Sequence, residues 1–198
     1  MEYQDILPLV NQFNNRISEV NMTFKRYLHE KINWNARLIG IKGARGVGKS
    51  TLLLQHIKES FLDLQNVFYA SLDDLWFRGH NLLDLVEYLY THGYTHLFLD
   101  EVHKLGQWSR YIKNIHDSYP RLRIVYTGSS MLEIDHSKVD LSRRQMLYTM
   151  HGLSFREYLE FEGIGTFPAV SVEDLLGSHL PIAMEIASHT DRDRKSVV

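Results

Sequence analysis

Short apolar runs alternate with longer amphipathic segments over most of the chain after residue 36. The five runs with the length and composition of buried strands are residues 37–42, 66–71, 95–100, 122–127 and 145–150. Between them, apolar residues recur at the three- and four-residue spacing of helices with one buried face. The clearest stripes are Leu82, Leu85, Val86 and Leu89, and Trp108, Tyr111, Ile112, Ile115 and Tyr119. This alternation predicts an α/β fold with a parallel sheet covered on both faces.

Helical spacing also marks both ends of the chain. Apolar positions recur at this spacing over residues 5–32, which predicts a two-helix lead-in. After the last strand, the segments LSFREYLEF and VEDLLGSHLPIAMEIAS predict further helices. We therefore expect a helical lead-in over residues 1–36, a core over 37–160, and over 161–198 the start of a C-terminal helical region that continues beyond this chain.

Composition narrows the possible classes of protein. The chain has 198 residues and a formal net charge of −2, which gives no overall electrostatic reason to bind nucleic acid, although a local DNA-binding patch is possible. It contains no cysteine, which excludes disulfides and thiolate metal sites. It shows no secretory signal and no apolar stretch of about 18 residues, so we expect a cytoplasmic protein without a membrane span.

A glycine-rich segment follows the first predicted strand and opens a predicted helix. Its sequence, GARGVGKST, matches the pattern G-x-x-x-x-G-K-[ST] of a P-loop, or Walker A motif. Glycines let successive backbone amides turn inward around a phosphate at a helix N-terminus. The residues expected to bind nucleotide are Gly43, Ala44, Arg45, Gly46, Val47, Gly48, Lys49, Ser50 and Thr51.

Three side chains at the end of this motif have distinct expected roles. Lys49 would reach the β- and γ-phosphates of ATP, and Thr51 would lie near the α-phosphate. The Ser50 hydroxyl is placed to coordinate Mg²⁺. ATP and Mg²⁺ are therefore the expected cofactors.

The third predicted strand ends in an acidic pair, in the sequence LFLDEVH. Ligands of parallel sheets bind beyond the carboxyl ends of the strands, where Asp100, Glu101 and the P-loop would meet. This pattern is a Walker B element. We expect Asp100 to hold Mg²⁺ through a water molecule, and Glu101 to orient and deprotonate the water that attacks the γ-phosphate.

The fourth predicted strand ends in TGSSM, and two arginines precede the fifth. Thr127, Ser129 and Ser130 stand where a polar side chain could contact the γ-phosphate or the attacking water, although such residues also cap helices. We expect Ser129 or Ser130 to sense the phosphate. Arg143 and Arg144 carry the side chain best suited to a developing phosphoryl charge.

Taken together, these elements resemble the AAA-type ATPases of bacteria and archaea whose domain usually precedes a domain of unknown function. The matching segments are RYLHEKI, RLIGIKGARGVGKSTLLLQ, LFLDEVHKLGQW, IVYTGSSML, and DLSRR followed by GLSFREYL. The resemblance implies a sheet of order 5-1-4-3-2, a polar sensor in TGSS, and an arginine finger, for which Arg144 is the best match and Arg143 the next. His103 stands where many members of this family carry glutamine.

These features predict an Mg²⁺-dependent ATPase that drives or gates a conformational change in a partner or assembly. The expected partners are further copies of the chain or another protein. The sequence DEVH invites a helicase interpretation, but the chain lacks a second motor domain. A nucleotide kinase would have no role for Glu101. The alternative from another class of protein is a nucleotide-gated switch or adaptor that hydrolyses ATP slowly. Such a switch could also associate with DNA.

Overall fold

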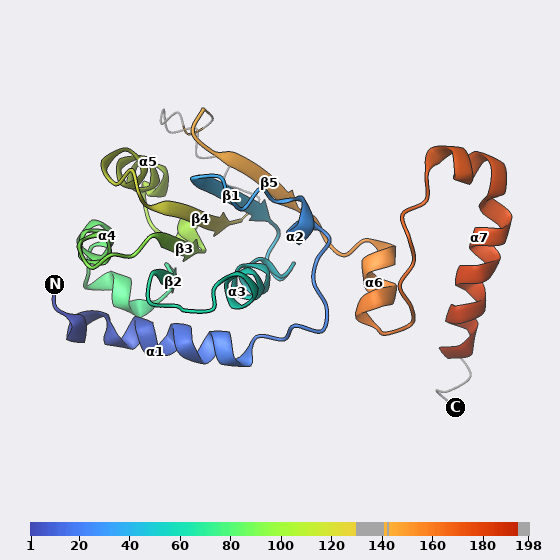
Figure 1. The fold of residues 1–198 in the computed structure, drawn as a ribbon, viewed down its shortest axis with the longest axis horizontal. Helices are drawn as coiled ribbons and strands as arrows, with labels where there is room; N and C mark the ends of the chain where they lie inside the picture. Colours follow the sequence, from blue (N-terminus) through green and yellow to red (C-terminus); the bar gives the residue numbers. More distant parts are fainter. Residues whose placement is uncertain (130–140, 142, 194–198) are drawn as a thin grey trace. The chain divides into compact units, whose positions relative to one another are not determined.

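A parallel sheet of five strands forms the centre of the part of the chain that the structure describes, which is residues 1–129, 141 and 143–193 of a computed structural model. The strands are β1 Leu38–Gly43, β2 Val67–Ser71, β3 His96–Asp100, β4 Arg123–Gly128 and β5 Met146–Met150. Their order across the sheet is β2-β3-β4-β1-β5 (Figure 1). This confirms the predicted order 5-1-4-3-2, and each strand begins one residue later than the sequence predicted.

Helices cover both faces of this sheet, because alternate strand residues point to two separate apolar cores. On one face, side chains such as Leu38 and Leu97 pack under α4 Leu82–Thr91 and α5 Trp108–Ser118. On the other, Ile39 and Phe98 pack under α3 Lys49–Ser60. The buried apolar residues of α4 and α5 belong to the two stripes that the sequence predicts as core. Two short 3₁₀ turns, η1 Leu75–Arg78 and η2 Val102–Lys104, follow β2 and β3.

The lead-in contains one long helix and one short helix. Helix α1 Tyr3–Glu19 contributes to both cores, with Ile6 and Leu9 in the first and Phe13 in the second. It therefore runs beside the edge strand β2, as Figure 1 shows. The second helix, α2 Leu28–Lys31, is a single turn and buries none of its residues, so it is shorter than the periodicity suggested.

The chain divides into two compact units, residues 1–152 and 153–198. The second unit contains α6 Phe155–Phe161 and α7 Val172–Asp193. Helix α6 begins with a capping box, in which the Ser154 hydroxyl accepts from the Glu157 amide and the Glu157 carboxylate accepts from the Ser154 amide. None of the helices in the described residues is long and apolar enough to cross a membrane.

The last residue of β1 leaves no room for a side chain. A Cβ atom on Gly43 would lie 2.4 Å from the backbone oxygen of Met150, its partner in β5. Backbone in a sheet cannot move aside without breaking the ladder. Glycine at this position therefore allows β5 to pair with the strand that carries the P-loop.

We expect Gly43→Ala to lower the free energy of unfolding by about 1 to 3 kcal/mol, the usual cost of overpacking. Thermal unfolding followed by circular dichroism, without added nucleotide, measures this effect. Gly79→Ala is the matched control, because no atom lies within 4 Å of its added Cβ. A Gly43→Ala protein as stable as the control would contradict the tight β1–β5 contact.

Candidate functional site

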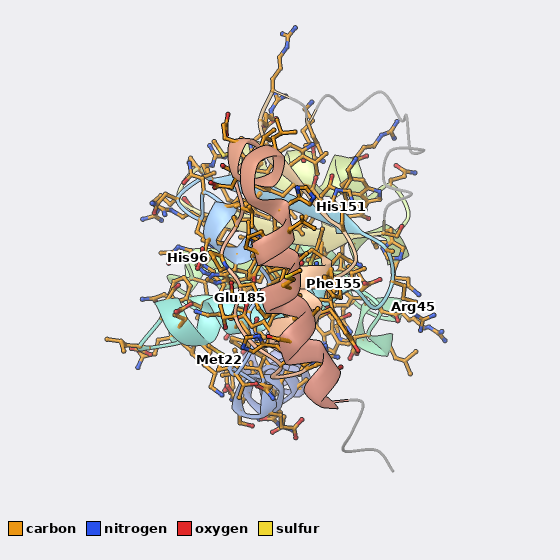
Figure 2. All side chains as sticks on the ribbon, turned by 90° about the vertical axis from the view of Figure 1, so that its right-hand side faces the viewer. Met22, Arg45, His96, His151, Phe155 and Glu185 are labelled. Carbon is orange, nitrogen blue, oxygen red and sulfur yellow. The ribbon has the colours of Figure 1, made fainter. Side chains whose placement is uncertain are left out.

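The P-loop segment, residues 43–51, links the carboxyl end of β1 to α3. Gly46 and Gly48 have φ angles of 80° and 97°, a left-handed conformation that residues with a Cβ rarely adopt. Gly48 is the N-cap of α3, so the loop leads directly into the positive end of a helix dipole. Figure 2 labels Arg45 of this loop and His96 at the start of β3 on opposite sides of the view. Because the loop follows the last residue of β1, it lies at the edge of the sheet where the parallel strands end.

The Lys49 side chain is buried within the P-loop, with 4% of the residue exposed. Its Nζ donates to the backbone oxygens of Gly43 at 3.0 Å and Ala44 at 2.9 Å. The same Nζ lies 3.9 Å from Oε1 of Glu101. The fold therefore brings together a lysine at the start of α3 and a glutamate that directly follows β3.

Asp100 ends β3 with its carboxylate buried between two neighbouring strands. Only 2% of the residue is exposed. Its Oδ2 accepts a hydrogen bond of 2.8 Å from the Tyr69 hydroxyl on β2, and its Oδ1 accepts from the Thr127 hydroxyl on β4. The Thr127 oxygen in turn accepts from the Glu101 amide at 3.1 Å. Thr127 thus contacts both members of the acidic pair.

Glu101 has a strained backbone and a partly exposed side chain. Its φ of 57° is left-handed, which is uncommon for a residue with a Cβ and often accompanies a functional constraint. Its Oε2 lies 3.3 Å from His103 Nε2, while His103 Nδ1 accepts from the Ser129 amide at 3.3 Å. This pattern assigns the ring hydrogen to Nε2. His103 therefore connects Glu101 to the residue that follows β4.

The donor atoms near the P-loop suit Mg²⁺ bound together with a phosphate ligand. The Ser50 hydroxyl and the Asp100 carboxylate are oxygen donors, the kind that Mg²⁺ prefers, and Mg²⁺ is usually held by one or two protein groups plus phosphates. Among the described residues, no group of three or more His, Asp or Glu side chains could hold a metal ion alone. Thr51 follows Ser50 in the first turn of α3 and is exposed.

The arginines predicted near the fifth strand lie away from this site. Arg143 and Arg144 form a turn before β5, and Nε of Arg144 donates to Asp117 Oδ1 at 3.1 Å. Because β1 and β5 are parallel, Met150 is the residue of β5 that pairs with Gly43. The length of β5, about 16 Å, therefore separates the arginines from the P-loop. Ser130, the alternative phosphate sensor, lies outside the described residues.

Two side chains contact the site without any expectation from the sequence. Tyr69 reaches Asp100 because β2 and β3 are neighbours, which residue spacing alone does not reveal. Arg26 donates to the Val47 oxygen at 2.6 Å and to the His151 oxygen at 2.8 Å, so it connects the P-loop to the segment after β5. Its only signal was its place in the segment RYLHEKI, which carries no chemistry by itself.

Comparison with known proteins identifies the family. The model of a family described as "AAA domain" matches residues 35–159, more than half of the chain. The chain therefore belongs to this AAA domain family. No curated protein matches its sequence.

Solved structures agree with this assignment at the level of the fold. AMPPCP-bound DnaA from Aquifex aeolicus is similar with a TM-score of 0.50 and 15% identity, over 99% of this chain and 68% of that one. The Hsp104–ADP complex from S. cerevisiae is similar with a TM-score of 0.52 and 16% identity, over 76% of this chain and 25% of that one. The core therefore has the AAA+ P-loop fold, and it spans only part of these larger chains.

Proposed function

We propose that this chain binds ATP with Mg²⁺ and hydrolyses it to ADP and phosphate, and that hydrolysis drives or gates a conformational change in a partner or assembly. The observation that carries this proposal is the meeting of Lys49 and Glu101. The buried ammonium of Lys49 in the P-loop lies 3.9 Å from the carboxylate of Glu101, the residue after the buried Asp100. Binding of AMPPCP to DnaA and of ADP to Hsp104 supports a nucleotide as the ligand.

Phosphate binding follows from the P-loop geometry. The amides of residues 44–49 and the N-terminus of α3 offer donors and a positive dipole to the β- and γ-phosphates. Lys49 Nζ, now bonded to two carbonyls of its own loop, would turn its donors to phosphate oxygens. Ser50 and Asp100 would hold Mg²⁺, which neutralises phosphate charge when bound.

Glu101 is the proposed general base. Its carboxylate accepts a proton from a water molecule while that water's oxygen bonds to the γ-phosphorus and the bond to the β-phosphate oxygen breaks. The Glu101 carboxylate lies 3.3 Å from His103 Nε2 and the Glu101 amide donates to the Thr127 hydroxyl, and both contacts restrict its orientation. The Ser129 amide donates to His103, which places Ser129 next to these residues, and Ser129 is the proposed sensor of the γ-phosphate.

Arg144 is the proposed arginine finger, and it acts on a neighbouring subunit. It lies at the amino end of β5, whereas the P-loop lies at the carboxyl end of the adjacent parallel strand. An arginine side chain cannot span this distance of about 16 Å within one chain. A second copy of the chain could bring its Arg144 to the first copy's nucleotide, which makes self-association part of the proposal.

We expect Lys49→Ala to weaken ATP binding at least about tenfold, because each charge-assisted contact to phosphate contributes about 1.5 to 3 kcal/mol. Isothermal titration calorimetry measures the affinity. Lys58→Ala is the matched control, since Lys58 lies on the same helix at its opposite end and is exposed. Unchanged affinity in a folded Lys49→Ala protein would exclude a P-loop role for this lysine.

Glu101→Gln should have a different effect, because the amide keeps the size of the side chain but cannot accept a proton. We expect ATP binding to persist and hydrolysis to fall about 10²- to 10⁴-fold. Phosphate release under saturating ATP measures this, with the exposed Glu87→Gln on α4 as control. Turnover at the wild-type rate would leave Glu101 without a catalytic role.

Specific ATPase activity should rise with protein concentration if Arg144 acts on a neighbour, since such fingers contribute about 10³ to 10⁵ in rate. Arg144→Ala should bind ATP normally and hydrolyse it poorly. Mixing it with Glu101→Gln should restore activity, because mixed assemblies contain sites with an intact Glu101 and a donated Arg144. Arg143→Ala is the control, and a loss confined to that variant would reassign the finger.

A further inference from the structure

Helix α1 lies outside the residues that match the AAA domain family, yet it contacts a residue of the site. Phe13 stacks on the Tyr69 ring, with centroids 5.9 Å apart and planes at 27°. Arg16 lies three residues later on the same helical face, and its Cζ is 5.7 Å from the centre of that ring. Its Nη1 also donates to the Tyr69 hydroxyl at 3.1 Å. Helix α1 therefore holds both the ring and the hydroxyl of Tyr69.

The hydrogen bonds through Tyr69 have a defined direction. Arginine has only donors, so the Tyr69 oxygen accepts from Arg16 and its own hydrogen goes to Asp100 Oδ2, 2.8 Å away. A chain of donors thus runs from the first helix of the protein to the buried carboxylate.

The hydrogen bonds that run from Arg16 through Tyr69 restrict the orientation of the Asp100 carboxylate. Tyr69 from β2 and Thr127 from β4 engage different oxygens of the same carboxylate, so rotation of the carboxylate plane would break one of the bonds. Arg16 places its positive charge next to the Tyr69 hydroxyl, and this hydroxyl, not the guanidinium, donates to the carboxylate. Each carboxylate oxygen has a second lone pair, which leaves acceptor capacity for a metal-bound water. Mg²⁺ requires near-ideal octahedral geometry, so a fixed carboxylate favours its binding.

We propose that α1 is a functional part of this ATPase, with Arg16 and Tyr69 acting as positioning residues that orient Asp100 toward Mg²⁺. This inference rests on the proposed ATP- and Mg²⁺-binding function. It assigns a role to residues before the AAA domain match, and it makes Tyr69 more than a buried ring of the core. Hydrogen-bond partners of metal-binding side chains commonly contribute about 10- to 100-fold to metal affinity or activity.

The chain offers a matched control pair far from the site. Arg121 stacks over the ring of Tyr90 at 4.9 Å and donates to its hydroxyl at 3.1 Å, as Arg16 does with Tyr69. Tyr90 lies on α4, and Arg121 precedes the start of β4. Tyr90→Phe and Arg121→Met therefore remove the same groups from the same kind of contact. They leave the carboxyl edge of the sheet unchanged.

The test measures binding of a fluorescent ATP analogue in EDTA and across an Mg²⁺ titration, for the wild-type protein, Tyr69→Phe, Arg16→Met and both controls. We expect Tyr69→Phe to bind the analogue in EDTA as the wild-type protein does, but to need about tenfold more Mg²⁺ for the Mg²⁺-dependent gain in affinity. Arg16→Met should shift the titration in the same direction by less, and Arg16→Lys should recover part of that shift. Thermal unfolding verifies that each variant is folded.

The outcomes separate the two proposals. A wild-type protein that binds no analogue, or binds it without any response to Mg²⁺, would overturn the proposed function. A wild-type protein that responds to Mg²⁺, with Tyr69→Phe and Arg16→Met titrating like their controls, would overturn the role of α1 alone. Variants that lose stability but keep the wild-type Mg²⁺ titration would also overturn the role of α1, because α1 would then contribute only to packing. If Tyr69→Phe does not fold, Arg16→Met decides the question.

Discussion

The buried carboxylate of Asp100 imposes the constraint on which the proposed site depends. A charge removed from water costs several kcal/mol unless hydrogen bonds replace its hydration. The two strands beside β3 provide those bonds, through Tyr69 on one side and Thr127 on the other. The sheet order is therefore a condition for the site as well as for the core, because both hydrogen bonds to this carboxylate come from strands next to β3.

The P-loop satisfies its own buried charge in a comparable way. Lys49 is bonded to two carbonyls of the loop and lies near Glu101, so its ammonium remains solvated by protein groups. A bound phosphate would take the place of these carbonyls as the partner of the ammonium. The left-handed backbone of Glu101 fits the same interpretation, since strain of this kind persists where neighbouring structure enforces it.

Because β1 and β5 are parallel neighbours, two proposed catalytic elements lie at opposite ends of these strands. The P-loop follows the carboxyl end of β1, and Arg144 precedes the amino end of β5. A single chain therefore has the proposed nucleotide site at the carboxyl ends of the strands and Arg144 at their amino ends. Such an arrangement suits an assembly in which each subunit completes its neighbour's site, and it connects the proposed ATPase activity to association between copies.

Local features of the sequence determined the strands, the two core helices, the P-loop and the acidic pair. Burial on both faces makes a strand continuously apolar, and the P-loop needs its glycines and lysine at fixed spacing. The strand order followed only from resemblance to a family. Tertiary structure decided which side chains meet: Tyr69 and Arg16 are far from Asp100 in the chain, and only the β2–β3 pairing and the position of α1 bring them together. Contacts between neighbouring strands carry no periodic signal, so residue patterns could not reveal them.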